Sequence, residues 1–217
     1  MLLSPLPATF YQRAGREHGV QEVARQLLGT RLVRRLAGQL LSGYIVETEA
    51  YQGESDLACH ARAGYTKRTA VMYGPPGRAY VYLIYGMHWM LNCVTGPAGQ
   101  PEAILIRAIL PSSGVDEMAR RRGLATSARR SAADLTGGPA RLCQALAIDG
   151  ALNNADLCDP HGELVIESGA REEIQEDMVH TGPRVGIQNV PEPWRSQPWR
   201  FWIPGWSGPA ASPDRTF

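Results

Sequence analysis

Two glutamates and a tyrosine alternate in a segment whose residue types favour β-structure. Glu47, Glu49 and Tyr51 occupy every second position near the end of Tyr44–Tyr51, and alternate residues of a strand project from the same face. Burying unpaired carboxylates is unfavourable, so this face is expected to line a cleft. A carboxylate placed there could act as a general base towards a water molecule.

An arginine interrupts a second apolar segment. Arg107 follows the run Ala103–Ile106, so its guanidinium must either reach solvent at a sheet edge or pair with an acid. A buried Arg–Glu pair that holds a water molecule would satisfy both groups. The residues alone leave these two alternatives open.

Tyrosines are concentrated in the same part of the chain, since seven of the eight lie between residues 44 and 85. Tyrosine favours strands, which explains each one singly but not two carboxylates beside an aromatic face that includes Tyr80 and Tyr82. Such a pocket suits a flat, electron-poor ring next to a hydrolysable bond. Catalysis through a lysine Schiff base has almost no candidate, because Lys67 is the only lysine. The residues alone indicate a hydrolase that acts on an aromatic ligand.

The elements that must position these groups follow from periodicity and turn residues. The expected strands are 44–51, 79–85, 88–94 and 103–110, the second and third joined by a hairpin tip at Gly86–Met87. Helices are expected at 20–28, 115–122 and 138–148, with Pro139 in the first turn of the last one. We expect a surface loop at 123–133 and an irregular segment over the last 27 residues.

Composition places the chain among ordinary globular proteins. With 217 residues, 44% hydrophobic content and a net charge of +1, residues 1–217 are expected to form one domain. No apolar run reaches the roughly 18–20 residues that cross a bilayer, and Pro5 and Pro7 interrupt the apolar start, which argues against a secretory signal. An intracellular, cytoplasmic protein is expected. The four cysteines lack zinc-site spacing and are expected to be reduced and mostly buried.

Several segments closely resemble the alkyladenine (3-methyladenine) DNA glycosylases, and they occur in the family's order. The matching segments are GYIVETEAYQGESDLACH (43–60), MYGPPGRAYVYLIYGMHWMLN (72–92), ILIRAILP (104–111), GGPARLCQALAI (137–148), PRVG (183–186) and PWRF (198–201). The resemblance implies a single compact domain of mixed α/β (α+β) structure. Its curved antiparallel sheet, surrounded by helices, should carry a protruding hairpin that enters the DNA minor groove.

The resemblance also implies a monofunctional enzyme of base excision repair. It would rotate an alkylated purine (3-methyladenine, and also 7-methylguanine or hypoxanthine) out of duplex DNA and leave an abasic site without strand cleavage. It would need no metal and no nucleotide cofactor. Its partner would be double-stranded DNA that contains damaged purines, with no membrane and no obligate protein partner. Insertion of one hairpin requires only a monomer.

Roles for individual residues come from their positions in the matching motifs. Tyr51 and His60 should flank one face of the flipped base and Tyr82 the other, where aromatic rings attract a cationic purine. Asn92 should lie near position 2 of the purine, where the amino group of guanine would collide. A satisfied polar group on a strand is the structural alternative for Asn92.

The same comparison implies the catalytic groups. Glu49 matches the general base that deprotonates the attacking water, and Arg107 matches the arginine that helps to hold this water. A main-chain carbonyl near Val185 should complete the site. Glu47 is the competing candidate for the base, although its motif position favours Glu49.

Contacts with DNA are implied for four further residues. Tyr85 is similar to the family's wedge, which fills the space that the flipped base leaves. Thr66, Arg68 and Met72 fall in a region that touches the DNA backbone, but 61–71 is the segment least similar to the family. Two rival functions remain, a non-catalytic binder of flipped or abasic nucleotides and a hydrolase of free nucleosides. Release of free base from alkylated duplex DNA, lost in Glu49→Gln, would exclude the first, and the second leaves Tyr85 without a purpose.

Overall fold

Two long antiparallel strands form the centre of the molecule, β2 (Gln39–Gln52) and β5 (Glu102–Ser113). The computed structural model describes residues 4–12, 18–124 and 131–208. The other strands are β1 (Arg31–Leu36), β3 (Ala79–Ile84), β4 (His88–Thr95), β6 (Leu164–Glu167), β7 (His180–Gly182) and β8 (Arg200–Trp202). Within the described residues they form one sheet of eight strands in the order β3-β4-β5-β2-β1-β6, with β8 paired to β2 and β7 to β8.

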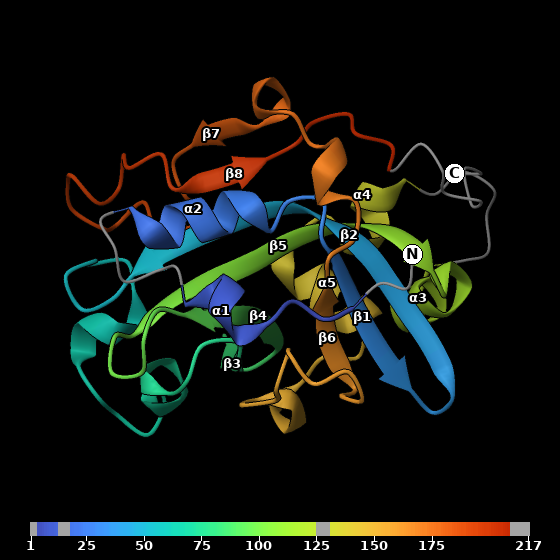
Figure 1. Ribbon diagram of the computed structural model, residues 1–217, viewed down its shortest axis with the longest axis horizontal. Helices are drawn as coiled ribbons and strands as arrows, with labels where there is room; N and C mark the ends of the chain where they lie inside the picture. Colours follow the sequence, from blue (N-terminus) through green and yellow to red (C-terminus); the bar gives the residue numbers. More distant parts are fainter. Residues whose placement is uncertain (1–3, 13–17, 125–130, 209–217) are drawn as a thin grey trace.

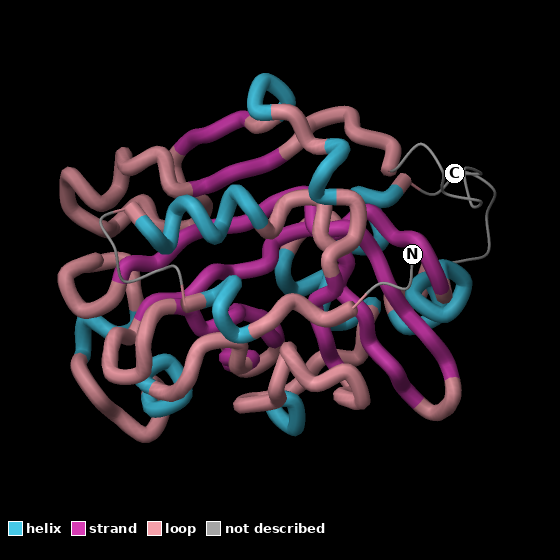
Figure 2. The backbone as a smooth tube through the Cα atoms, in the orientation of Figure 1, coloured by secondary structure: helices cyan, strands magenta, loops and turns pink. Residues whose placement is uncertain are grey.

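The helices are short and lie around this sheet (Figures 1 and 2). The α-helices are α1 (Ala8–Tyr11), α2 (Gly19–Gln26), α3 (Val115–Arg121), α4 (Ala132–Thr136) and α5 (Pro139–Ala145). The 3₁₀ turns are η1 (His60–Ala63), η2 (Ala70–Tyr73), η3 (Gly150–Leu152), η4 (Arg171–Glu173) and η5 (Glu176–Met178). The fold is therefore a single α+β domain with an antiparallel sheet, as the resemblance implied.

Most expected elements are present, with differences at their ends. The helix expected at 138–148 ends at Ala145, and the strand expected at 79–85 ends at Ile84 because Tyr85 has a positive φ of 51°. The expected loop at 123–133 is wrong at its end, since Ser131 caps α4 through a capping box. Residues 125–130 of that loop lie outside the described residues.

The edge of β2 changes partner along its length. Its first part, Gln39–Tyr44, pairs with β1, whereas Glu47–Glu49 pair with β8. The strand β8 belongs to the segment expected to be irregular, so that expectation is wrong for residues 200–202. A short strand needs only a partner edge to form, and β2 offers one where β1 has ended. Figure 1 shows β7 and β8 along the upper side of the molecule, above α2.

A pair of bulges in the centre of the sheet determines which side chains face the core. Ile45 pairs with Ile109 and Glu47 with Ala108, which leaves Val46 without a register partner on β5, and Arg107 is skipped in turn between Ala108 and Ile106. An extra residue shifts the alternation of a strand by one position. Ile45 therefore faces the core, as do Thr48 and Ala50 after the bulge, while Glu47, Glu49 and Tyr51 share the opposite side.

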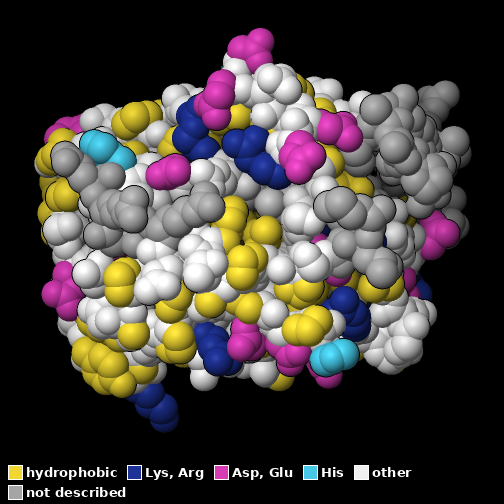
Figure 3. Space-filling model, in the orientation of Figure 1, with side chains coloured by type: hydrophobic (Ala, Val, Ile, Leu, Met, Phe, Trp, Pro, Cys, Tyr) yellow, Lys and Arg dark blue, Asp and Glu magenta, His cyan; other side chains and the backbone are white. Residues whose placement is uncertain are grey.

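The surface carries mixed charge, in keeping with 22 basic and 21 acidic residues. On the face shown in Figure 3, basic side chains lie beside acidic ones, with apolar groups between them. All four cysteines are free, and only Cys158 is partly exposed. Over residues 4–12, 18–124 and 131–208, no helix is both long and apolar enough to cross a bilayer. The same residues contain no cluster of three or more His, Cys, Asp or Glu side chains suited to a metal ion.

Candidate active site

A cavity of about 370 Å³ opens beside the β3–β4 hairpin, between segment 57–62 and segment 185–190. Its volume is in the range of cavities that bind small ligands. Eight of the eleven residues that the sequence proposed for the site line it: Tyr51, His60, Met72, Tyr82, Tyr85, Asn92, Arg107 and Val185. The aromatic residues and the arginine expected to share a site are therefore in one place.

Glu49 lies directly behind the wall of this cavity and is fully buried. The backbone N–H of Val185 donates to its Oε1 at 2.7 Å, and the Tyr51 hydroxyl donates to its Oε2 at 2.8 Å. A guanidinium nitrogen of Arg107 lies 3.2 Å from Oε1. Three groups of the cavity wall thus hold one carboxylate, and they come from β2, from β5 and from a segment close to the C-terminus.

The surroundings of Glu49 act on its pKa in opposite directions. Burial raises the pKa of Glu49, and the Arg107 guanidinium, the Val185 N–H and the Tyr51 hydroxyl offset part of this increase. The net pKa is above the ordinary value of 4.5. A carboxylate with a raised pKa is a stronger base than an exposed one, which suits it to accept a proton from water.

Glu47 lies on the same face of β2 but has different partners. Its Oε1 accepts from Arg107 Nε at 2.8 Å and from a terminal nitrogen of Arg200 at 3.3 Å. The Arg107 side chain is only 12% exposed and lies next to two carboxylates. Of the two alternatives that the sequence left open, the buried Arg–Glu pair is therefore the one observed, and Arg107 is not a solvated arginine at a sheet edge. Burial lowers the pKa of Arg107, but Glu49 and Glu47 outweigh it and the net pKa is raised.

Aromatic rings form one wall of the cavity and contact one another. The His60 and Tyr82 ring centroids are 4.5 Å apart at an interplanar angle of 70°, and Tyr80 lies 5.2 Å from Tyr82. At 4.5 Å two rings are in direct contact, which leaves no room for a third ring between them. His60 and Tyr82 must therefore move apart before a base can stack between them.

His60 begins η1 and is held in one orientation by Tyr80, since its Nδ1 lies 2.9 Å from the Tyr80 hydroxyl. Burial, together with the charges of Arg68 and Arg62, lowers the pKa of His60 to about 4. The imidazole is consequently neutral at pH 7. Tyr80 was expected to share the face of Tyr82, but its contact with His60 was not foreseen.

One polar residue, Asn92, and one apolar residue, Met72, form a buried part of the cavity wall. Asn92 is buried, and its Nδ2 donates to the Tyr80 carbonyl at 3.1 Å, which fixes the orientation of its amide. Met72 is only 2% exposed. Its side chain lies in the cavity wall, so the interpretation of Met72 as a surface contact for the DNA backbone does not fit its position.

Thr66 and Arg68 lie outside the cavity wall and are exposed. The Thr66 hydroxyl is 2.9 Å from that of Thr69, within a turn. The Arg68 guanidinium lies over the outer side of the Tyr82 ring, 5.2 Å from its centroid. Arg68 is therefore close enough to bridge the aromatic wall and an approaching anion.

Tyr85 is the most exposed of the large hydrophobic side chains described, at 86%. It occupies the turn between β3 and β4, where Tyr85 and Gly86 have φ values of 51° and 69° and the Met87 N–H donates to the Ile84 carbonyl. Positive φ is unfavourable for a bulky residue. An exposed aromatic side chain in a strained turn contributes little to folding, which points to contact with a ligand.

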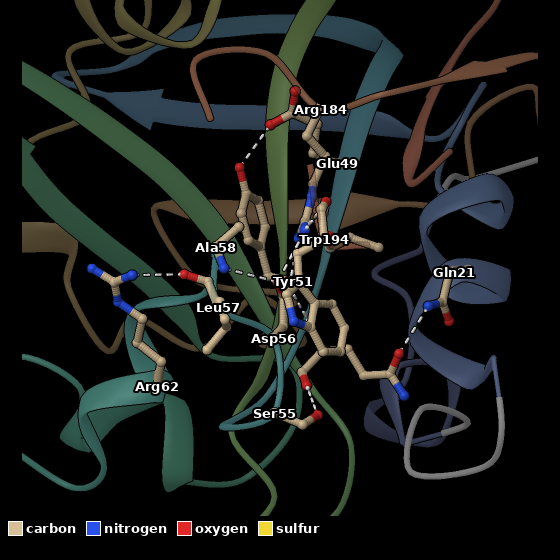
Figure 4. Close-up of polar contacts among 12 residues, drawn as sticks. Gln21, Glu49, Tyr51, Ser55, Asp56, Leu57, Ala58, Arg62, Arg184 and Trp194 are labelled. Atoms are coloured by element: carbon tan, nitrogen blue, oxygen red, sulfur yellow. Dashed lines mark hydrogen bonds and ion pairs between the residues drawn. The ribbon is translucent and has the colours of Figure 1, made fainter. Parts of the chain in front are cut away.

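Sequence reasoning missed a second buried ion pair next to the cavity. Arg184 and Asp56 are both fully buried as side chains and paired with each other. Both residues fall within the matching segments, and the close sequence position of Arg184 to Val185 was the one available signal. Figure 4 shows Asp56 and Arg184 grouped with Tyr51 and Glu49.

Comparison with known proteins gives consistent matches over most of the chain. The profile described as methylpurine-DNA glycosylase matches residues 14–207. A Myxococcus xanthus protein named "Putative 3-methyladenine DNA glycosylase" is 43% identical over 91% of this chain and 89% of its own length. Proteins of the same name from Methanocella arvoryzae and Carboxydothermus hydrogenoformans are each 45% identical over 91% of this chain, and over 91% and 94% of their own lengths.

The match covers nearly all of the described residues, including every element that contributes to the cavity. Sequence identity of this extent accompanies a common fold. The chain belongs to the methylpurine-DNA glycosylase family.

Proposed function

We propose that this DNA glycosylase excises damaged purines from duplex DNA: the alkylated bases 3-methyladenine and 7-methylguanine, and also hypoxanthine, which is deaminated adenine. A water molecule activated by Glu49 would attack C1′ of the sugar, and the bond to the purine would break to leave an abasic site. The observation that carries this proposal is the buried carboxylate of Glu49, which three donors of the cavity wall orient. Pure binding of a base would not need it.

The attacking water is best accommodated at the floor of the cavity. It would contact Glu49 on one side and the Arg107 guanidinium on the other, with the Val185 carbonyl as a further acceptor. Glu49 would take one proton, and the departing purine would keep the electron pair of the broken bond. A purine alkylated at N3 or N7 carries a positive charge and becomes neutral on leaving. Hypoxanthine is neutral, so it would take up one proton from solvent at a ring nitrogen as it leaves. Neither step needs a metal or a nucleotide cofactor.

Glu49 is preferred over Glu47 as the base because of their partners. The same oxygen of Glu47 accepts from two arginines, and its side chain is 20% exposed. Glu49 is buried and has a raised pKa. A buried carboxylate with a raised pKa is suited to act as a general base near neutral pH.

Recognition would depend on rings and on shape. Tyr51 and Tyr82, with His60, would enclose the flipped base, and their π-faces would favour a cationic ring by roughly 0.5–2 kcal/mol. Asn92 would exclude the amino group of guanine. Tyr85 would fill the gap in the duplex from the minor groove and offset part of the unstacking cost, which one copy of the protein can achieve alone.

The decisive experiment is release of free base from a duplex with a single 7-methylguanine, under single-turnover conditions. Glu49→Gln should lower the rate by 10²–10⁴-fold, the usual contribution of a general base, while binding of the duplex remains within twofold. Glu47→Gln is the matched control and should retain more activity. Full activity of Glu49→Gln would refute the mechanism.

Two further readouts separate the rival functions. Wild-type protein should leave abasic sites that break only after alkali treatment, because no lysine amine adjoins the cavity wall. It should release no base from free 7-methylguanosine. Activity on the nucleoside alone would favour a nucleoside hydrolase, and binding without any release would favour a pure binding protein.

A further inference from the structure

The buried ion pair of Asp56 and Arg184 lies beside Tyr51, and neither of its two side chains lines the cavity. One terminal nitrogen of Arg184 donates to Asp56 Oδ1 at 2.9 Å and the other donates to Oδ2, so the pair is bidentate. The carboxylate also accepts from the backbone N–H groups of Gln52 and Ala58, at 3.2 and 3.0 Å. Asp56 therefore fixes the loop that leads from β2 towards His60.

Arg184 connects this loop to two other segments. Its guanidinium donates to the Ala50 carbonyl of β2 at 3.0 Å and to the Trp194 carbonyl at 3.2 Å. It also lies between two rings, 4.7 Å from the centroid of Tyr51 and 4.9 Å from that of Trp199. Figure 4 shows Arg184 together with Tyr51 and Trp194. A planar guanidinium can make such bidentate and stacked contacts together, whereas an ammonium cannot.

Two neighbours of Arg184, Val185 in the chain and Tyr51 in space, donate hydrogen bonds to Glu49. Val185 follows Arg184 in the chain, and its N–H donates to Glu49 Oε1. The Tyr51 ring stacks on the guanidinium, and its hydroxyl donates to Glu49 Oε2. Each of these two donors therefore belongs to a residue that adjoins Arg184, either through the peptide bond or through the ring contact.

The energetics of buried ion pairs support a role beyond stability. Removing two charges from water is costly, and apolar residues of similar volume often stabilise a fold as well or better. A fully buried pair beside the base is more readily explained by the fixed geometry that it imposes on its neighbours.

We infer that Asp56 and Arg184 are positioning residues for the glycosylase reaction: they hold the Val185 N–H and the Tyr51 hydroxyl against the two oxygens of Glu49. This inference rests on the proposed role of Glu49. Neither residue is expected to touch the DNA.

Arg184→Lys tests the inference because it keeps the charge beside Asp56 but removes the bidentate and stacked geometry. Single-turnover release of 7-methylguanine is measured from pH 5 to pH 9 together with the affinity for the duplex. We expect the plateau rate to fall at least tenfold, since small displacements of reacting groups are costly. Weaker donation to Glu49 should also raise its pKa and move the acid limb to higher pH. Affinity should remain within twofold.

Arg31→Lys is the matched control. Arg31 also pairs with a buried carboxylate, that of Glu167, and donates to Ser42, but it lies at the other end of β2. Its variant should keep the plateau rate and the acid limb of the wild type. Wild-type inactivity would refute the proposed function itself, whereas an active wild type with unchanged rate and limb in Arg184→Lys would overturn this inference alone.

Asp56→Asn provides a second route if Arg184→Lys does not fold. Its carboxamide has the shape of the carboxylate but offers one acceptor oxygen, so only one guanidinium bond remains. We expect a lower plateau rate at unchanged duplex affinity and a native circular dichroism spectrum. A plateau rate equal to that of the wild type would overturn the inference.

Discussion

The two ends of β2 use arginine–carboxylate pairs in different ways. Beside the β1 end of β2, Gln39–Ile45, the pairs connect β1 with β6: Arg31 and Arg35 of β1 each lie 3.5 Å from Glu167 of β6. At the cavity end, Glu47–Gln52, the pairs are more deeply buried and cluster around Glu49 and Asp56. The first set lies on the margin of the sheet, and the second lies beneath a cavity.

The difference in burial between the two sets of ion pairs suggests different roles for the two ends of β2. At the sheet margin the two arginine side chains stay 18% and 37% exposed, so only the Glu167 carboxylate is taken out of water there. Charges under a cavity lose their hydration and need several partners each, and Glu49 has a raised pKa as a result. We expect substitutions at the β1 end to change stability and substitutions at the cavity end to change catalysis.

The largest effect on the rate of base release that follows from this contrast is expected at Arg107. Arg107→Gln leaves Glu47 and Glu49 without their shared cation, so the pKa of Glu49 should rise further and the acid limb of base release should move to higher pH. The plateau rate should fall by about 10²–10³-fold, as when one electrostatic stabiliser is lost. Arg35→Gln is the control, and an equal loss of rate there would contradict the contrast.

His60 should make the cavity end sensitive to acid. Its folded pKa of about 4 lies below the ordinary 6.5, so the unfolded chain binds the proton first as pH falls. The stability that neutral His60 contributes is complete above pH 6.5 and is lost as pH falls towards 4, up to about 3 kcal/mol.

Urea unfolding at pH 7 and pH 4.5 measures this loss in the wild type and in His60→Gln. The wild type should lose more of its free energy of unfolding between the two pH values than the variant does. Parallel losses would show that the His60 ring does not carry the acid sensitivity.

Glu167→Gln should show the opposite behaviour, a loss of stability without a loss of catalysis. The amide cannot match the charge of two arginines at this buried position, and the free energy of unfolding should fall by about 2 kcal/mol. Base release at a temperature where the variant is folded should equal that of the wild type. A slower plateau rate in folded Glu167→Gln would mean that the two ends are coupled.

The smallest effect is expected at the hairpin tip. Tyr85→Ser removes an exposed ring, so stability should change by less than about 0.5 kcal/mol, while affinity for the lesion duplex should fall about tenfold, or 1.4 kcal/mol. Leu40→Ser, at an exposed apolar position of the β1 end, is the control and should leave affinity unchanged. Equal affinities of the two variants would remove Tyr85 from the proposed contact with DNA.

Much of the cavity end followed from local sequence patterns. Alternation along β2 predicted that Glu47, Glu49 and Tyr51 share a face, and the contacts between Tyr51, Glu49 and Arg107 confirm this. The prediction succeeded because all three residues follow the bulge at Val46. Extending the same alternation back to Ile45 would have placed Ile45 beside the carboxylates, whereas it faces the core.

The rest depends on contacts between distant segments. Arg184 and Asp56 are 128 positions apart, and β8 forms because β2 has a free edge where β1 stops. Neither contact could be predicted from a local sequence pattern. Two residues so far apart in the chain share no local pattern, and the three residues of β8 are too few to show a periodicity. The contact of His60 with Tyr82 likewise reflects packing and not residue type.

The unpaired residue at position 46 divides β2 into two stretches that are out of phase. Up to Ile45 the odd positions belong to the core, and beyond it the even positions do. If Val46 took a regular place opposite β5 instead of forming the bulge, alternation counted on from Ile45 would turn Thr48 and Ala50 towards the cavity and send both acids into the interior. Deleting Val46 should instead leave both acids on the cavity side, because it removes the bulge without changing the pairing of Ile45 with Ile109 or of Glu47 with Ala108. The side of the sheet on which Glu47 and Glu49 lie therefore depends on how β2 accommodates one extra residue.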